Sequence, residues 1–417
     1  MLRRTCSVAK AVFLSALAVP LLRPINDEIR AVAAFSVALP AIDAVPDAIA
    51  YPATLLAAFR AGAALSVLNH PRMPRVDVPA GSAVLRLPSG ARVRLFYPAA
   101  EAGDGSATTM APYCTDGRQT SDGMAARVGF RQAGLSFLLG HLADACSGCI
   151  QDAPLRRADD TAISSENTTN VSLPLLIYSH GYGGNMDMAT YFFRTMASKG
   201  MILAAVEHTD GTASSTVLED GRERRFNEYL MTGRQQLVRR ASELLEAADF
   251  LPRELQRRFD DTNSTRVVGT ITLGGHSYGA PSAIMAANGA AAGAGVRGLL
   301  LHDPALGMGY GMLPPNGARS RIPSVTYVSD VYRRAGVRYG DATLHVRGGF
   351  HGNFVDAPLW APAAIMRPLS LAIPAAGPAD PWAVHEQLAD SAAAFLESGD
   401  PRHERVSAGD LLEPCKS

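Results

Sequence analysis

Apolar residues recur along the chain in two spacings, one typical of strands and one typical of helices. Short continuous apolar runs, as at 173–178 and 201–206, indicate strands buried on both faces of a parallel sheet. A longer stretch at 230–250 repeats its apolar residues at helical spacing. Together the patterns predict strands at 83–87, 91–97, 173–178, 201–206, 267–273, 299–301, 325–328 and 342–346. The predicted helices span 125–143, 188–198, 230–250, 278–288 and 383–396.

Strands that alternate with helices predict an α/β fold, in which a mostly parallel, doubly wound sheet is covered on both faces. In such sheets the catalytic groups lie on loops at the carboxyl ends of the strands. We therefore look for chemistry directly after the predicted strands. The polar stretches at 103–123 and 152–170 are expected to be loops.

The N-terminal region has a different pattern. Basic residues precede an apolar run at 11–22, as in a secretory signal, although an uncleaved anchor or a transit peptide has a similar pattern. Charged residues and prolines interrupt the apolar stretches at 31–50 and 51–68, which favours a segment lying on a membrane surface over one spanning it. We predict an apolar targeting or membrane-associated segment at 1–75, a catalytic domain at 76–398 and a C-terminal tail at 399–417.

The charge balance argues against nucleic acid as a partner. Lys plus Arg and Asp plus Glu number 39 each, and no basic run with interleaved aromatic residues is present. Three glycosylation sequons begin at Asn167, Asn170 and Asn263. With the N-terminal pattern they favour a secreted or membrane-associated glycoprotein that enters the secretory pathway.

Five cysteines are present, and four remain if a signal peptide is removed. An even number permits disulfides, and we expect a disulfide between Cys114 and either Cys146 or Cys149. A zinc site would need two further ligands at suitable spacing, which the chain does not offer, so we expect no metal or cofactor. The remaining cysteine residues are Cys6 and Cys415.

Gly275-His-Ser277-Tyr-Gly279 has the pattern of a nucleophile elbow. The predicted strand at 267–273 leads into it and a helix rich in small residues follows it, as this motif requires. Side chains at the two glycines would collide with neighbouring backbone. Ser277 is therefore the predicted nucleophile.

A serine hydroxyl needs a base to take its proton, and in this fold the acid and the histidine follow the serine in the chain. Asp303 ends the strand at 299–301, and His351 follows the strand at 342–346. They are the predicted acid and base, with Asp330 as the alternative acid. Asp356 is expected to orient the histidine loop, and the other histidines near strands are expected to be structural: His208, His276, His302 and His345.

An oxyanion hole needs two backbone N–H groups directed at the developing negative charge. Tyr278 directly follows the nucleophile and supplies one. The glycine-rich stretch His180-Gly-Tyr182-Gly-Gly follows an early strand, and Tyr182 is the expected second donor. A phosphate-binding loop would need a following Lys-Ser/Thr, which is missing here.

Several stretches together resemble the plasma-type platelet-activating-factor acetylhydrolases, a family of secreted or membrane-associated, calcium-independent phospholipases with an α/β-hydrolase fold. The stretches occur in the family's order over roughly 300 residues, the size of one hydrolase domain. They are Val93–Pro98, Tyr178–Gly183, Ala204–Asp210, Gly274–Gly279, Leu301–Asp303 and Arg347–Asp356. The family has no clear counterpart to the region before Pro71 or to the stretch 103–170. Conversely, this chain has no clear match to the family's lipoprotein-docking surface.

The resemblance implies the same triad, Ser277, Asp303 and His351, and the same oxyanion donors, Tyr182 and Tyr278. It implies hydrolysis of short or oxidised sn-2 acyl groups of phospholipids through an acyl-serine. A general carboxylesterase, lipase or polyester hydrolase is the alternative with the same chemistry. A non-catalytic hydrolase-like module that binds membranes is the alternative without it.

Overall fold

The computed structural model describes residues 70–71, 73–100, 108–132, 136–156, 172–260, 266–290, 295–363, 366 and 376–415. They belong to one compact unit, Asn69–Ser417. The predicted N-terminal segment lies outside the described residues up to position 69, and the three sequon asparagines also lie outside them. No helix in the described ranges is both long enough and apolar enough to cross a membrane.

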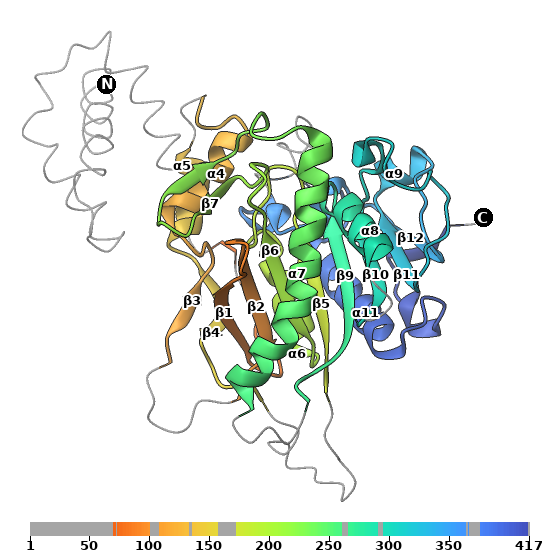
Figure 1. Ribbon diagram of the computed structural model, residues 1–417, viewed down its shortest axis with the longest axis horizontal. Helices are drawn as coiled ribbons and strands as arrows, with labels where there is room; N and C mark the ends of the chain where they lie inside the picture. Colours follow the sequence, from red (N-terminus) through yellow and green to blue (C-terminus); the bar gives the residue numbers. More distant parts are fainter. Residues whose placement is uncertain are drawn as a thin grey trace, which may run out of the picture. The chain divides into compact units, whose positions relative to one another are not determined.

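An 11-stranded sheet forms the centre of the described chain (Figure 1), in the order β13-β12-β11-β10-β9-β5-β6-β2-β1-β4-β3. Neighbouring strands from β6 through β5, β9, β10 and β11 to β12 run parallel, and antiparallel pairs flank this block. The strands are β1 (Ala80–Arg86), β2 (Arg92–Pro98), β3 (Met110–Pro112), β4 (Cys146–Gln151), β5 (Leu173–Ser179), β6 (Ile202–Glu207), β9 (Val268–His276), β10 (Val296–His302), β11 (Ser324–Val328), β12 (Ala342–Val346) and β13 (Leu412–Pro414). A separate hairpin joins β7 (Ser215–Val217) to β8 (Glu223–Arg225). This is the mostly parallel sheet that the sequence predicts.

Helices cover both faces of the sheet. They are α4 (Arg118–Arg127), α5 (Phe137–Gly140), α6 (Thr190–Ser198), α7 (Gly233–Phe259), α8 (Gly279–Gly289), α9 (Asp330–Arg334) and α11 (Pro381–Ser398). Short 3₁₀ helices are η3 (His141–Ala143), η5 (Leu306–Gly309), η6 (His351–Phe354), η7 (Ala357–Leu359) and η8 (Glu404–Val406). Helices α7 and α8 bury Leu244 and Ile284 in one apolar cluster, whereas α6 and α11 bury Phe192 and Phe395 in another. The α/β-hydrolase architecture is thus confirmed.

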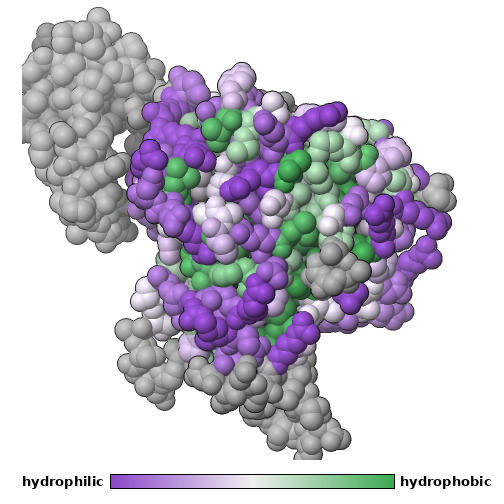
Figure 2. All heavy atoms as spheres, in the orientation of Figure 1, coloured by the Kyte–Doolittle hydropathy of each residue, from purple (hydrophilic) through white to green (hydrophobic). Residues whose placement is uncertain are grey.

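Helix α7 extends past the predicted end at residue 250 and continues through Pro252 to Phe259. A proline removes one helical hydrogen bond, but Leu251 and Leu255 are fully buried on either side of it and hold this part of the helix against the core. Figure 2 shows hydrophilic side chains over the C-terminal part of α7 and apolar ones between α7 and α8. The helix is therefore set by its amphipathic pattern despite the proline.

Two sequence predictions for the region before residue 150 were wrong. The helix expected at 125–143 is broken after α4, because Gly129 adopts a φ of 81° that ends the helical path. The expected loop at 103–123 contains β3 and most of α4. The stretch at 399–417, expected to be a tail, contributes η8 and the edge strand β13.

The expected disulfide is not formed either, because Cys114, Cys146, Cys149 and Cys415 are all free. Cys146 and Cys149 lie on β4, where Cys146 is exposed and Cys149 is buried, so the two do not face the same side. Cys114 packs in a different apolar cluster from Cys149. Burial raises the pKa of both the Cys114 and the Cys149 thiol, which makes them unreactive core residues.

Candidate active site

Ser277 lies in the tight turn between β9 and α8, with a φ of 55°. This left-handed conformation costs a non-glycine residue about 1–2 kcal/mol. A Cβ at Gly279 would collide with the Ser179 carbonyl, and one at Gly275 would collide with the Gly279 backbone. The two glycines are therefore required by close backbone approach, and the turn is a strained elbow of the kind that the motif predicts.

Asp303 directly follows β10, the neighbour of β9, and is fully buried with a φ of 44°. Its backbone N–H donates to the Tyr327 carbonyl at 2.8 Å. Its carboxylate accepts one hydrogen bond from the Ser329 N–H at 2.7 Å and one from His351 Nδ1 at 2.9 Å. Asp303 is thereby fixed from the backbone of β11 and aligned with the histidine.

His351 begins η6, and its side chain is 28% exposed. The imidazole stacks on the Tyr332 ring at 5.1 Å and lies 4.4 Å from the ring of His276, the residue before Ser277. Because Nδ1 donates to Asp303, Nε2 is the nitrogen left to accept a proton. No hydrogen bond joins Ser277 Oγ to His351 in the described chain, and a long contact here is common in hydrolases without substrate.

The expected oxyanion donors lie on two loops that meet beside Ser277. The first loop is the glycine-rich turn that carries Tyr182, and it is closed by a hydrogen bond of 3.0 Å from the Gly184 N–H to the Gly181 carbonyl. A Cβ at Gly181 would lie 3.1 Å from the Ser277 Cβ, so this turn is adjacent to the elbow. The Tyr182 and Tyr278 rings pack edge to face at 5.6 Å, and neither amide has an acceptor among the described residues.

The alternative acid has another partner. Asp330 Oδ1 lies 2.6 Å from His345 Nε2 and accepts from the Gly348 N–H at 3.2 Å. The structure thus brings Asp303, and not Asp330, to His351. Asp356 is fully buried and accepts from the Tyr113 hydroxyl at 2.9 Å. Burial raises the pKa of Asp356 to about 8, which suits a structural carboxyl that anchors the histidine loop.

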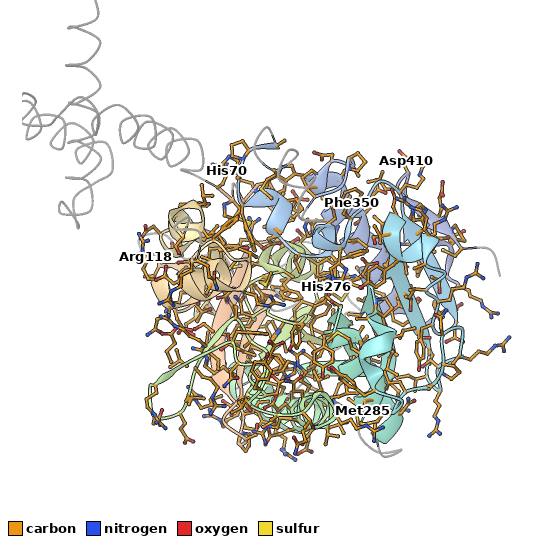
Figure 3. All side chains as sticks on the ribbon, turned by 90° about the horizontal axis from the view of Figure 1, so that it is seen from above. His70, Arg118, His276, Met285, Phe350 and Asp410 are labelled. Atoms are coloured by element: carbon orange, nitrogen blue, oxygen red, sulfur yellow. The ribbon has the colours of Figure 1, made fainter. Side chains whose placement is uncertain are left out.

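The other histidines are structural in this arrangement. The Tyr178 hydroxyl bonds His302 Nδ1 at 2.7 Å, and burial lowers the pKa of His302 to about 3. His276 Nε2 donates to the His351 carbonyl at 3.1 Å, and burial followed by the nearby His351 lowers the pKa of His276 well below its ordinary value. Both imidazoles stay neutral, and the His276 ring packs directly against that of the catalytic histidine. In Figure 3 His276 lies near the centre of the view, between Arg118 and Asp410.

A second Ser-His-acid array lies beneath the site and is invisible in the sequence pattern. Ser179 Oγ donates to His208 Nε2 at 2.7 Å, and His208 Nδ1 donates to Glu243 Oε2 at 2.7 Å. All three side chains are at most 1% exposed, so no substrate reaches them. Because Ser179 ends β5 directly before the glycine-rich turn, the array holds the start of that turn in place.

Arg240 was also missed by sequence reasoning, and it connects both oxyanion loops. Its guanidinium donates to the His180 carbonyl at 2.6 Å and pairs with Asp210 at 2.8 Å. It also bonds Thr212 Oγ1 and lies 4.9 Å from the Tyr278 ring centroid. Arg240 is fully buried, and its position one residue before the apolar Ala241 gives no sequence signal for this role.

Comparison with known proteins agrees with this architecture. The family "Platelet-activating factor acetylhydrolase, isoform II" matches residues 85–274, slightly less than half of the chain. The resemblance to that family is confirmed. A platelet-activating factor acetylhydrolase from Bos taurus is 48% identical over 48 residues, which are 12% of this chain and only 11% of the bovine protein.

Among solved structures, a ferulic acid esterase from Streptomyces cinnamoneus superposes with a TM-score of 0.55 at 19% identity. The superposition covers 82% of this chain and 98% of the esterase chain, and it shows the shared fold. The family match and the α/β-hydrolase architecture support carboxylic ester hydrolysis as the activity. The matched residues end before Ser277, so the triad rests on the geometry described above.

Proposed function

We propose that the protein is a serine esterase that hydrolyses short or oxidised sn-2 acyl groups of phospholipids, with Ser277, Asp303 and His351 as its triad. The observation that carries the proposal is the 2.9 Å hydrogen bond between His351 and the buried Asp303, at a histidine packed against the elbow of Ser277. An aspartate that accepts from Nδ1 sets the tautomer in which Nε2 is a base. The family match supports the phospholipid substrate.

In the first half-reaction, Ser277 Oγ attacks the ester carbonyl carbon while His351 Nε2 takes the hydroxyl proton. The carbonyl oxygen becomes an oxyanion that accepts from the Tyr182 and Tyr278 amides. The bond to the leaving glycerol oxygen then breaks, and His351 returns the proton to that oxygen. Water repeats the sequence on the acyl-Ser277, so that a fatty acid and free enzyme are released. Asp303 stays ionised and stabilises the imidazolium at each step.

The N-terminal segment supports a place for this reaction at a membrane or lipid surface, reached through the secretory pathway. A lipid ester that is poorly soluble in water would then meet the enzyme at its own interface.

Fluorophosphonate labelling of the purified full-length chain tests the serine mechanism. Wild-type protein is expected to be labelled, and Ser277→Ala to be unlabelled, with turnover of an aryl acetate lowered by several orders of magnitude. Asp303→Asn should lower turnover by about 10³–10⁴-fold, whereas Asp330→Asn should leave it within about twofold. Undiminished hydrolysis by Ser277→Ala would refute the mechanism. Unlabelled wild-type protein would favour a non-catalytic module.

The substrate class needs a separate comparison. We expect kcat/KM to be highest for phospholipids with short sn-2 acyl groups and to fall as the acyl chain lengthens. Triglycerides, aryl esters and a feruloyl ester serve as the comparison set. A preference for any of these over every phospholipid would replace the phospholipase proposal with a general esterase of the same mechanism.

A further inference from the structure

Arg127, the last residue of α4, lies against the glycine-rich turn that carries Tyr182. A Cβ at Gly183 would lie within 2.6 Å of the Arg127 Cδ, which shows that the arginine side chain crosses directly over this turn. Gly181 of the same turn is adjacent to Ser277, since a Cβ at Gly181 would lie 3.1 Å from the Ser277 Cβ. An arginine thus stands at the rim of the candidate active site, on the loop that would hold the oxyanion.

Two aromatic rings fix the plane of this guanidinium. Its central carbon lies 4.7 Å from the Phe226 ring centroid and 5.5 Å from the Tyr182 centroid, and these two rings pack edge to face at 5.2 Å. The Phe226 N–H donates a hydrogen bond to the Ser214 carbonyl at 3.3 Å, which holds this residue in place. Stacking on aromatic faces orients an arginine and leaves the N–H groups at its edge free to donate.

Arg127 has no carboxylate partner in the described part of the chain. Glu228 is engaged by the Tyr182 hydroxyl at 3.1 Å and forms no ion pair with Arg127. Arg127 is exposed, whereas Arg118 at the other end of α4 pairs with Asp144. An oriented, unpaired guanidinium beside a catalytic turn is suited to a bidentate bond with a planar or tetrahedral anion.

We propose that Arg127 binds an anionic group of the ester substrate and thereby determines its specificity. The shared chemistry is an oxyanion with two acceptor oxygens: either the phosphodiester of a lipid headgroup or the free carboxylate at the end of an oxidatively truncated acyl chain. This inference rests on the proposed function, which it deepens by naming the part of the substrate that is recognised. The attacked ester remains at Ser277, and Arg127 takes no part in bond making.

Soluble ester substrates that differ by one charge test the proposal with the full-length enzyme. A short-chain sn-2 thioester phospholipid below its micellar concentration carries the phosphodiester, and its counterpart without the phosphate is neutral. A p-nitrophenyl ester of glutaric acid carries the carboxylate, and p-nitrophenyl butyrate is its neutral counterpart. The readout is the ratio of kcat/KM for each anionic substrate to that for its neutral partner.

Arg127→Gln is expected to lower this ratio between about 10-fold and about 100-fold for the anion that is recognised, the range for a lost hydrogen bond between charged groups. Arg127→Lys should restore part of the ratio because it keeps the charge without the bidentate fork. Arg131→Gln removes another exposed arginine four residues further on and should leave the ratio unchanged. The arm in which the ratio falls identifies the phosphodiester or the carboxylate.

An unchanged ratio in both arms for Arg127→Gln would overturn the inference while leaving the serine esterase proposal intact. The same conclusion follows if wild-type enzyme hydrolyses the neutral esters but neither anionic one. Activity that persists in Ser277→Ala would instead refute the proposed function itself. The two failures are therefore distinguishable.

Discussion

Arg240→Met tests whether the two oxyanion loops depend on one buried cation. The substitution keeps an unbranched, flexible side chain that can fill part of the space and removes the guanidinium. It deletes the bonds to the His180 carbonyl and Thr212 and leaves the Asp210 carboxylate, which is fully buried, without its counterion.

The expected cost follows from that unpaired carboxylate. Removing one partner of a buried ion pair typically destabilises a protein by about 3–5 kcal/mol. Burial raises the pKa of Asp210, but Arg240 and, to a smaller extent, His208 and Thr212 together bring it down to about 2. The difference from the ordinary value of 3.8 corresponds to about 2 kcal/mol of net stability. Removing Arg240 should cost more than this net value, because the burial penalty of the carboxylate is then uncompensated. That contribution is present above pH 4 and is lost as the pH falls toward 2.

Urea unfolding followed by circular dichroism at pH 7 measures the loss. We expect the free energy of unfolding of Arg240→Met to be lower than that of the wild type by about 3–5 kcal/mol. Arg253→Met is the matched control on the same helix, because Arg253 pairs with Asp249 at the surface with both side chains more than 70% exposed. That pair should contribute at most about 1 kcal/mol.

The double variant Arg240→Met/Asp210→Asn separates the charge from the packing. Removing the orphaned carboxylate should recover part of the lost stability. We expect kcat to be lower than that of the wild type in both the single and the double variant, because the His180 carbonyl lacks its donor in each. If Arg240→Met cost no more than Arg253→Met, or if its kcat equalled that of the wild type, the assigned role of Arg240 would be wrong.

Two further predictions follow from the same region. Gly279→Ala would place a methyl group against the Ser179 carbonyl and should lower the free energy of unfolding in urea by about 1–3 kcal/mol. Gly289→Ala on the same helix is the control, because its methyl group meets open space and should not destabilise the protein. Equal stabilities of the two variants would contradict the steric argument. Burial raises the pKa of Asp356 to about 8, so the folded state binds this proton more tightly than the unfolded state between about pH 4 and pH 8. The unfolding free energy of the wild type, relative to that of Asp356→Asn, should therefore fall as the pH rises through this window. A difference that does not change with pH would show that the pKa of this carboxyl is not raised.

The sequence predicts the sheet well because its central strands are buried on both faces. Strands such as β5 and β6 consist largely of continuous apolar residues, so their identity does not depend on distant partners. The elbow is equally local, since Gly275 and Gly279 are required by contacts within a few residues of Ser277 and with the adjoining strand. These features could be inferred because the physical cause lies in the segment itself.

The features that could not be predicted depend on partners far along the chain. Arg240 and Glu243 are buried on the same helix as the apolar stripe, and their burial is made tolerable by partners far along the chain, among them Asp210 and His208. A periodicity analysis counts such residues as the solvent-facing side. Arg127 likewise is positioned by Gly183 and by the rings of Tyr182 and Phe226, and α4 itself was mispredicted.

Strand register explains how three residues so far apart in sequence converge. His276 of β9 pairs with His302 of β10, so the residues that follow them, Ser277 and Asp303, leave neighbouring strands at the same level. Strands lie about 4.8 Å apart, and β12 is two strands beyond β10. The loop that carries His351 must therefore pass over the end of β11. A hydrogen bond of 3.0 Å, donated by the Asp330 N–H to the Gly349 carbonyl, fixes that path. A loop so anchored returns His351 to the strand end of Asp303. This is why the hydrogen bond from His351 Nδ1 is accepted by the acid that follows β10 and not by Asp330 at the end of β11.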